Sequence, residues 1–229
     1  MHDLVILLDV DNTLLDNDRF GADLHARLTQ DFGAAGCERY WDIYQQVREE
    51  RGCVDYLETL QRFRPDLEQD PKLLQMSRFL LDYPFADRLY PHVFETLKHL
   101  GTLGLPVILS DGDVVFQPRK IQRTGLWDAV DGRVLITVHK QQCMDAVQRI
   151  YPAQHYAMVD DKPDLLAAMK EVMGSRLTTV LARQGHYAND AAADSAASKL
   201  DLTISHIAEL RDLDAARLSA ARDSSPPAT

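Results

Sequence analysis

The chain has 229 residues, of which 45% are hydrophobic and 26% are charged. This length allows one large domain or two modest ones, and the composition is ordinary for a soluble globular protein. The formal net charge of −10 and the pI near 5.2 argue against a nucleic-acid partner that is held by bulk electrostatics.

The cysteines and the N-terminal residues indicate in which compartment the protein is expected. Cys37, Cys53 and Cys143 are too few and too widely spaced for a disulfide framework or a Cys-x-x-Cys metal site. The N-terminus lacks the basic region of a signal peptide, and no apolar run is long enough to span a membrane. We therefore expect a cytoplasmic protein without a membrane partner, and the sequence leaves its oligomeric state open.

The first element is an apolar run over residues 4–8 that ends in Asp9, with Asp11 two residues later. Such a run is typical of a strand that is buried on both faces of a parallel sheet, and ligands bind at the carboxyl ends of these strands. One carboxylate there can attack as a nucleophile while the other transfers protons. Two acids also concentrate negative charge, for which Mg²⁺ is the natural counterion. The alternative explanation is an ordinary Asp-Asn turn.

Helices are expected next. Apolar residues recur at helical spacing between residues 17 and 85, and no strand pattern interrupts them. Gly33 and Gly36 can end the first helix, while Pro65 and Pro71 mark later breaks. A helical module therefore interrupts the α/β pattern directly after its first strand. Core packing is the simplest explanation for its apolar stripes.

The second strand is predicted over residues 106–109, after a helix over 93–103. It ends at Ser110, which is followed by Asp111 and a glycine turn. A hydroxyl and free backbone amides at a strand end are suited to binding a phosphoryl oxygen. A helix cap would explain the same residues without any function.

Two further strands also end in polar residues. Residues 134–138 predict a strand, and Lys140 opens the following helix, where its ammonium group could hold a phosphate. Residues 155–159 predict a strand that ends in Asp160 and Asp161. Taken alone, each of these polar residues can be explained by an ordinary turn, a helix cap or an exposed surface position. Because parallel strands share one edge of a sheet, we expect these side chains to meet there.

The last predicted elements are a helix over 164–173, a strand over 177–182, a polar loop over 184–197, a short strand over 202–204 and a helix from about His206. The end of the sequence is rich in Ala, Ser and Pro, which predicts a flexible tail.

This order of motifs resembles that of the haloacid dehalogenase superfamily, most of whose members are Mg²⁺-dependent phosphatases. An Asp-x-Asp-x-Thr motif, a strand ending in Ser or Thr, a lysine and an acidic pair occur in that order over about residues 4 to 210. The resemblance implies an α/β fold: a Rossmann-like parallel sheet core over residues 1–16 and 86–212, flanked by helices. It also implies an inserted all-helical cap over 17–85, which leaves 213–229 as the flexible tail.

The resemblance also implies catalytic roles. Asp9 would be the nucleophile that forms an aspartyl-phosphate, and it would also bind Mg²⁺. Asp11 would be the general acid and base, with its backbone carbonyl on the metal ion. Lys140 would steady both the phosphate and Asp9, and Ser110, with Asp111 beside it, would bind the substrate.

The metal site would be completed by Asp160 or Asp161. Members of the superfamily often have Gly-Asp where this chain has two adjacent aspartates, so either residue could be the ligand. The family lysine is often followed by proline, whereas Gln141 follows Lys140 here. This departure keeps Lys120 and Lys162 as alternatives to Lys140.

The resemblance therefore implies a phosphatase that hydrolyses a small phosphorylated metabolite. Asp11 favours phosphate chemistry over dehalogenation, because the dehalogenases of the superfamily do not need a second acid. A phosphomutase and a non-catalytic Mg²⁺ or phosphate-binding scaffold are the alternatives. Arg19, Arg48 and Arg51 of the helical module are candidates for substrate recognition, although surface charge is the simpler explanation for each.

Overall fold

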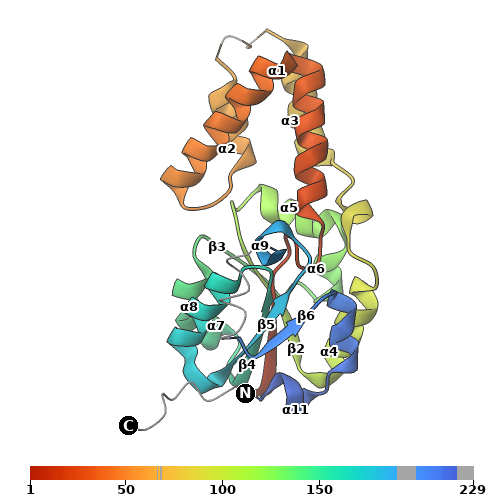
Figure 1. Cartoon of the computed structure of the whole chain (residues 1–229), viewed down its shortest axis with the longest axis vertical. Coiled ribbons are helices and arrows are strands. Elements are labelled where there is room, and N and C mark those ends of the chain that lie inside the picture. The colour runs from red at the N-terminus through yellow and green to blue at the C-terminus, as the bar shows by residue number, and fades with distance from the viewer. Residues whose placement is uncertain (66, 68, 190–199, 221–229) are drawn as a thin grey trace.

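A parallel six-stranded sheet forms the centre of the molecule. Figure 1 shows the computed structural model of the chain, which describes residues 1–65, 67, 69–189 and 200–220. The strand order is β3-β2-β1-β4-β5-β6, and all neighbouring strands are parallel. The strands are β1 (His2–Leu8), β2 (Leu105–Asp111), β3 (Val134–Thr137), β4 (Ala153–Asp160), β5 (Leu177–Ala182) and β6 (Leu202–Ile204). Since helices flank this sheet, the predicted Rossmann-like α/β core is confirmed.

Strand β1 lies in the middle of the sheet, between β2 and β4. Its residues 4–8 are buried, and alternate side chains enter two separate hydrophobic cores. The first core receives Leu4, Ile6 and Leu8, and the second receives Val5 and Leu7. Because both faces are covered, the strand has no polar face, which explains its uninterrupted apolar run.

Helices supply the rest of both cores. Elements that contribute to the first core are α4 (Val93–Leu103), α5 (Phe116–Arg123), α6 (Leu126–Ala129), η4 (Ile207–Asp212) and α11 (Ala215–Leu218). The second core is completed by α7 (Met144–Ile150) and α8 (Pro163–Met173). The short elements η2 (Lys140–Gln142), η3 (Gly174–Arg176) and α9 (His186–Asn189) lie in connections.

Several predicted elements agree with the structure, and others differ in their starts. The helix over 93–103 is confirmed, with Gly104 at its end. The chain after Lys140 first forms the 3-10 turn η2 before α7 begins, and the predicted helix from His206 is the 3-10 helix η4. Residues 186–189 of the predicted polar loop form α9, whereas residues 190–199 lie outside the described part of the chain.

The flexible tail predicted over residues 213–229 begins too early. The carboxylate of Asp214 accepts a hydrogen bond from the backbone of Arg217 at 2.8 Å and so caps α11. Leu218 of this helix is fully buried in the first core. Its apolar side chain therefore ties this segment to the core despite the polar composition around it. Residues 221–229 lie outside the described residues.

The helical module lies between β1 and β2 in the sequence. It consists of α1 (Asn17–Arg51), α2 (Tyr56–Phe63) and α3 (Pro71–Asp82), followed by η1 (Phe85–Arg88). Asp16, Asp55 and Asp70 cap the three α-helices through side-chain bonds to backbone N–H groups. Gly33 breaks α1, with φ of +74° and ψ of 177°. No strand occurs among the described residues between 17 and 85, as the sequence predicts.

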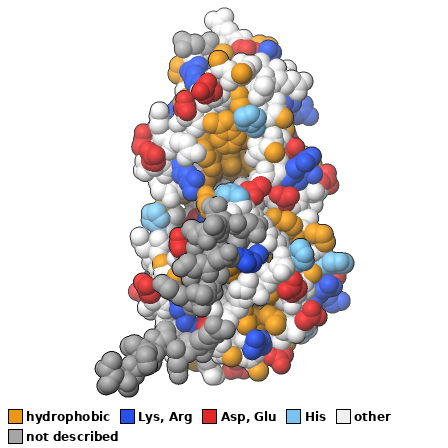
Figure 2. All heavy atoms as spheres, viewed as in Figure 1, with side chains coloured by type: hydrophobic (Ala, Val, Ile, Leu, Met, Phe, Trp, Pro, Cys, Tyr) orange, Lys and Arg blue, Asp and Glu red, His pale blue; other side chains and the backbone are white. Residues whose placement is uncertain are grey.

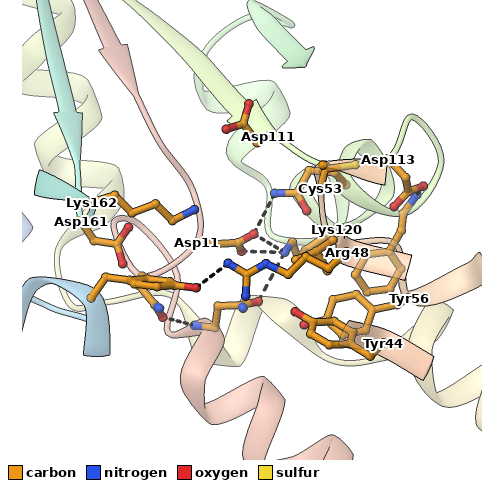
Figure 3. A pocket seen from close by; sticks show the side chains of 18 of the residues that line it. Asp11, Tyr44, Arg48, Cys53, Tyr56, Asp111, Asp113, Lys120, Asp161 and Lys162 are labelled. Atoms are coloured by element: carbon orange, nitrogen blue, oxygen red, sulfur yellow. Dashed lines mark hydrogen bonds and ion pairs between the residues drawn. The ribbon is translucent and has the colours of Figure 1, made fainter. Parts of the chain in front are cut away.

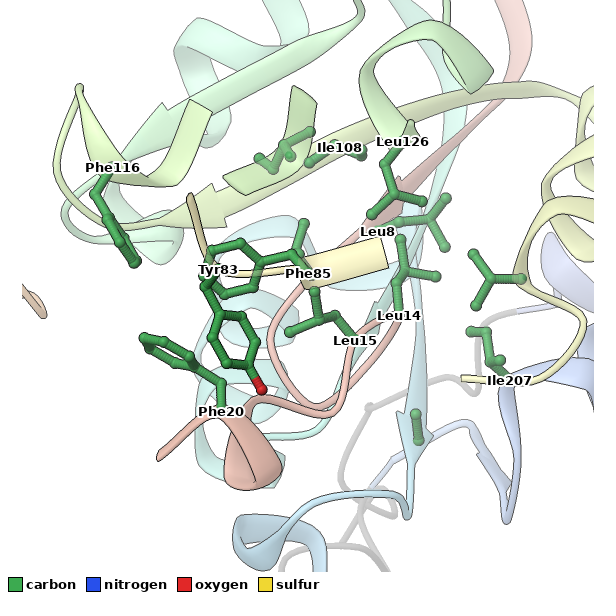
Figure 4. Packing of buried hydrophobic residues seen from close by; sticks show 14 of the residues in the cluster. Leu8, Leu14, Leu15, Phe20, Tyr83, Phe85, Ile108, Phe116, Leu126 and Ile207 are labelled. Atoms are coloured by element: carbon green, nitrogen blue, oxygen red, sulfur yellow. The ribbon is translucent and has the colours of Figure 1, made fainter. Parts of the chain in front are cut away.

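Aromatic rings join the helical module to the sheet. The ring centroid of Phe20 in α1 lies 4.9 Å from that of Tyr83 and 5.0 Å from that of Phe85. Phe116 of α5 lies 5.8 Å from Phe85, and Figure 4 shows these rings beside the leucines of the first core. All four rings belong to the first core, which therefore continues from the sheet into the module.

The module stands beyond the carboxyl ends of the strands (Figure 1). On the face drawn in Figure 2, acidic and basic side chains are interspersed, and hydrophobic side chains line a recess in the module. None of the helices in the described ranges combines the length and apolar character that a membrane crossing needs. The edge of the sheet beneath the module is the place where the predicted functional residues meet.

Candidate active site

The loop after β1 sets the positions of Asp9 and Asp11. Asn12 has φ of +58°, a left-handed conformation that asparagine tolerates better than most residues. Its side-chain oxygen accepts hydrogen bonds from the backbone N–H groups of Asn17 and Asp18, at 3.0 and 3.1 Å. The loop is thereby tied to the first turn of α1. The motif after the first strand therefore connects the sheet edge directly to the helical module.

A buried ion-pair cluster lies at the ends of β1 and β4. The ammonium group of Lys140 donates to the Asp9 carboxylate and, at 2.7 Å, to Oδ2 of Asp160. Oδ1 of Asp160 accepts from the backbone N–H of Lys162 at 2.9 Å. Lys140 is 1% exposed, Asp9 is 4% exposed and Asp160 is fully buried. Of the three lysines considered from the sequence, Lys140 is therefore the one that contacts Asp9.

Burial and charge shift the protonation of this cluster in opposite directions. Burial raises the pKa of Asp9 to about 6, although the positive charge of Lys140 opposes the shift. Burial by itself would lower the pKa of Lys140, but the charges of Asp160 and Asp9 outweigh it and raise that pKa. Lys140 therefore stays charged and compensates two buried carboxylates.

Asp161 lacks such compensation. Both of its carboxylate oxygens are buried and have no hydrogen-bond partner among the described residues. Burial, followed by the charges of Asp160 and Asp9, raises the pKa of Asp161 to about 9. Oxygens of Asp9, Asp160 and Asp161 lie within 4.8 Å of one another. Buried carboxylates without partners are costly, and a hard divalent cation with oxygen ligands fits this donor set.

Asp11 belongs to a second polar group, at the ends of β1 and β2. Lys120 of α5 donates to both carboxylate oxygens of Asp11, at 2.6 and 2.8 Å. Gln117 donates one hydrogen bond to Asp11, at 3.0 Å, and another to the hydroxyl of Ser110, at 2.9 Å. Lys120 is 1% exposed, and Phe85 and Phe116 place their rings beside its ammonium group. These contacts fix the carboxylate of Asp11 against the start of α5.

Ser110, which is predicted to bind the substrate, is buried beside Gln117. Ser110 is 1% exposed, its hydroxyl accepts a hydrogen bond from Gln117, and it does not line the cavity described below. Asp111 does line that cavity, and its carboxylate accepts from the hydroxyl of Thr137 at 3.0 Å. Gln117 has no distinguishing pattern in the sequence. Its position one turn from Lys120 on α5 is its only signal.

A cavity of about 170 Å³ separates these groups from the helical module (Figure 3). Its lining combines carboxylates, cations and aromatic rings. The carboxylates are those of Asp11, Asp111, Asp113 and Asp161, the cations are Arg48, Lys120 and Lys162, and the rings are those of Tyr44, Tyr56, Phe116 and Tyr187. This volume lies below the roughly 300–1,000 Å³ of most ligand pockets, so it suits a ligand of few atoms, and the mixed charge suits a polar one.

Only one of the three arginines considered from the sequence lines this cavity. Arg48 of α1 donates to the hydroxyl of Tyr187 at 3.0 Å. Arg19 instead pairs with Asp23 at 3.5 Å, and Arg51 pairs with Glu58 at 3.6 Å. Both pairs lie outside the cavity lining and are half-exposed, so surface charge accounts for them.

Comparison with known proteins identifies a family whose model matches this chain. Residues 4–172 match the family described as haloacid dehalogenase-like hydrolase. A crystal structure of a haloacid dehalogenase-like hydrolase from Burkholderia xenovorans LB400 is 54% identical, with a TM-score of 0.88 over 95% of this chain and 99% of that chain. No curated protein matches the chain.

More distant crystal structures share the fold. A haloacid dehalogenase-type hydrolase from Bacillus subtilis bound to magnesium is 15% identical, with a TM-score of 0.62 over 93% of this chain and 98% of that chain. A 2-haloacid dehalogenase from Pseudomonas syringae pv. tomato DC3000 is 18% identical, with a TM-score of 0.62 over 93% and 97% of the two chains. At these identities the likeness extends to the fold alone.

Proposed function

This chain belongs to the haloacid dehalogenase-like hydrolases, and on that premise we propose that it is a Mg²⁺-dependent phosphatase of a small phosphorylated metabolite. The observation that carries the proposal is Asp161, whose buried carboxylate has no partner among the described residues and lies beside Asp9. A cation at this place would compensate its charge and leave Lys140 for Asp9. The helical module would act as the cap that encloses the substrate.

Asp9 is the proposed nucleophile. Its carboxylate oxygen attacks phosphorus, a new P–O bond forms, and the bond between phosphorus and the ester oxygen breaks. Water then attacks the phosphorus of the aspartyl-phosphate, so that the bond to Asp9 breaks and inorganic phosphate is released. Lys140 holds the attacking carboxylate in place and reduces its repulsion from the incoming phosphate.

Asp11 is the proposed general acid and base. The departing ester oxygen takes a proton from Asp11, and the attacking water later returns one to it. Lys120 and Gln117 hold the carboxylate in position for both transfers. Because Lys120 donates to both oxygens, one of these contacts must open when Asp11 carries its proton.

Mg²⁺ would be held by carboxylate oxygens of Asp9 and Asp161 and by the backbone carbonyl of Asp11. When bound, it would neutralise charge on the phosphoryl oxygens and lower the repulsion that opposes attack. Asp160 is the poorer candidate ligand, because its two oxygens already accept hydrogen bonds from Lys140 and from the Lys162 backbone. We therefore assign Asp161 as the metal ligand and Asp160 as the partner that orients Lys140.

Phosphate release from p-nitrophenyl phosphate, with and without Mg²⁺, tests the proposal. We expect Asp9→Asn to abolish metal-dependent turnover and Asp11→Asn to lower it by about 10²- to 10⁴-fold. Asp145→Asn is the matched control, because Asp145 is exposed on α7. Full activity of Asp9→Asn would contradict the mechanism.

The same assay separates the alternatives. Sustained turnover without a bisphosphate activator would count against a phosphomutase, which returns the phosphoryl group to a sugar. Mg²⁺ binding without turnover on a broad panel of phosphate esters would instead favour the non-catalytic scaffold. Release of halide from a 2-haloacid would favour dehalogenation, the reaction named for the Pseudomonas syringae structure.

A further inference from the structure

We propose that Arg48 and Lys162, which both contact Tyr187, form a second anion site in the cavity. The substrate would then be a phosphate monoester that carries a further anionic group, either a carboxylate or a second phosphate. This inference rests on the proposed phosphatase function and adds the substrate class to it.

Tyr187 brings the two cations together. Its hydroxyl accepts a hydrogen bond from Nη2 of Arg48 at 3.0 Å, and its ring centroid lies 5.3 Å from Nζ of Lys162. Arg48 belongs to the helical module, Lys162 follows β4 and Tyr187 belongs to α9, so three distant segments meet here. Figure 3 shows that the Arg48 and Lys162 side chains point into the same cavity.

Both cations lack a carboxylate partner. The other two lysines at the site are neutralised, because Lys120 pairs with Asp11 and Lys140 pairs with Asp9 and Asp160. Within the described part of the chain, neither Arg48 nor Lys162 has a carboxylate oxygen within 4.0 Å. Contact with a tyrosine leaves the charge of Arg48 uncompensated, whereas the carboxylates of Asp160, Asp9 and Asp161 lie near enough to Lys162 to stabilise part of its charge. A guanidinium without a carboxylate partner attracts an anion and can bind a carboxylate or phosphate through two parallel hydrogen bonds, and the ammonium group of Lys162 lies on the same tyrosine.

The positions of the two cations suggest how the ligand lies. The backbone N–H of Lys162 bonds Asp160, which places the start of this residue beside the acidic cluster and the proposed nucleophile. Arg48 enters from the opposite wall, which the module provides together with Tyr44 and Tyr56. A phosphoryl group that reaches Asp9 therefore leaves Arg48 for the part of the substrate beyond the ester oxygen.

Binding of non-hydrolysable phosphonates tests the site without relying on turnover. Isothermal titration calorimetry of the full chain with Mg²⁺ would compare propylphosphonate with 3-phosphonopropanoate and with propane-1,3-bisphosphonate. We expect each doubly anionic probe to bind at least tenfold more tightly than propylphosphonate. The tighter of the two identifies whether the second group is a carboxylate or a phosphate.

Variants of the proposed site assign the preference to its residues. Arg48→Met should reduce the preference to about twofold or less, and Tyr187→Phe should reduce it partly by removing the hydroxyl that positions Arg48. Arg51→Met is the matched control, because Arg51 is on the same helix but pairs with Glu58 outside the cavity. Equal binding of all three probes by the wild type would overturn the inference, as would a preference that survives Arg48→Met.

Turnover separates the two proposals. Propyl phosphate and 3-(phosphonooxy)propanoate differ only in the carboxylate, and kcat/KM for both should be measured alongside the calorimetry. A binding preference without hydrolysis of any phosphate ester would contradict the phosphatase and leave the anion site standing. Hydrolysis of both esters without any binding preference would contradict the anion site alone.

Discussion

The two walls of the cavity balance their charges differently. On the sheet side, Lys140 and Lys120 are each 1% exposed and each contacts carboxylates directly. On the module side, Arg48 is exposed and donates a hydrogen bond to the hydroxyl of Tyr187, and it has no carboxylate partner within the described residues. A wall whose charges are matched internally holds its geometry before any ligand arrives. A wall with an unpaired cation can bind an anionic group of a ligand. The sheet side therefore suits chemistry, and the module side suits recognition of the ligand.

Removal of Lys140 should destabilise the sheet side of the cavity more than any other change considered. Lys140→Met leaves the buried carboxylates of Asp9 and Asp160 without their shared cation. We expect a loss of about 3–5 kcal/mol in the free energy of unfolding, together with the loss of turnover. Urea denaturation measures the first effect. Lys98→Met is the control, because Lys98 is exposed on α4. A stability loss as small as that of the control would mean that the cluster is not paired as described.

Lys120→Met should have the next largest effect. This change removes the partner that holds both oxygens of Asp11, and about 2 kcal/mol of stability should be lost because Asp11 remains partly exposed. Turnover should fall about 10²-fold, since a misplaced general acid loses much of its contribution. A double-mutant cycle with Asp11→Asn provides the check. Additive effects of the two changes on kcat/KM would show that Lys120 does not act through Asp11.

Asp161 is the exception on the sheet side, because its carboxylate has no hydrogen-bond partner among the described residues. Without metal, Asp161→Asn should be more stable than the wild type at pH 8, on the order of 2 kcal/mol, because the folded wild type must bind a proton at the buried Asp161 and asparagine needs none. Added Mg²⁺ should stabilise the wild type by about 2.7 kcal/mol at a hundredfold excess over Kd, and the variant much less. Equal stabilisation of both proteins by Mg²⁺ would remove Asp161 from the metal site.

The pH dependence of the metal-free protein follows from the same carboxylate. The folded state raises the pKa of Asp161 from 3.8 to about 9, so between these values the folded chain binds the proton more tightly than the unfolded chain. Stability should therefore decrease as pH rises from about 4 to 9. Asp9, whose pKa rises to about 6, contributes in the same direction up to that pH. Asp161→Asn should flatten the upper part of this slope, as thermal melts in a chelating buffer would report.

The smallest expected effect concerns the backbone of the helical module, away from the cavity. Gly33→Ala puts a side chain at φ of +74°, which should cost about 1–2 kcal/mol. Gly21→Ala is the matched control on the same helix, because its site is open and helical, and alanine should stabilise it by up to about 1 kcal/mol. Thermal melts compare the two variants. We expect neither to alter kcat by more than about twofold, because Gly33 and Gly21 do not line the cavity.

The sheet edge could be predicted from the sequence because parallel strands bring their carboxyl ends to one side. Asp9, Asp160 and Asp161 directly follow apolar runs, and Lys140 opens the next helical segment, so their convergence needs only the strand order. Ser110 shows the limit of this reasoning. The strand continues past it to Asp111, and its hydroxyl accepts a hydrogen bond from Gln117, which depends on how α5 packs.

The module wall could not be predicted in the same way. No local pattern in the sequence singles out Arg48 from Arg19 and Arg51, whereas the tertiary contact with Tyr187 does. Tyr187 follows a polar stretch with no periodicity, so no local pattern places it against α1. The predicted tail begins too early for a related reason, because Leu218 is a single apolar residue whose burial depends on the first core being in place.

The central position of β1 has a consequence for how the protein folds. β1 is made first, but its partners are β2, which begins at Leu105, and β4, which begins at Ala153. Pairing with β2 must therefore wait until about half of these 229 residues have been made, and pairing with β4 until about two thirds. Contacts this distant along the chain form slowly. The helices of the module, made in between, rely on local contacts and can form earlier. Asp9 acquires its buried neighbours Lys140 and Asp160 only after β4 has been made, so this buried cluster depends on late, long-range contacts.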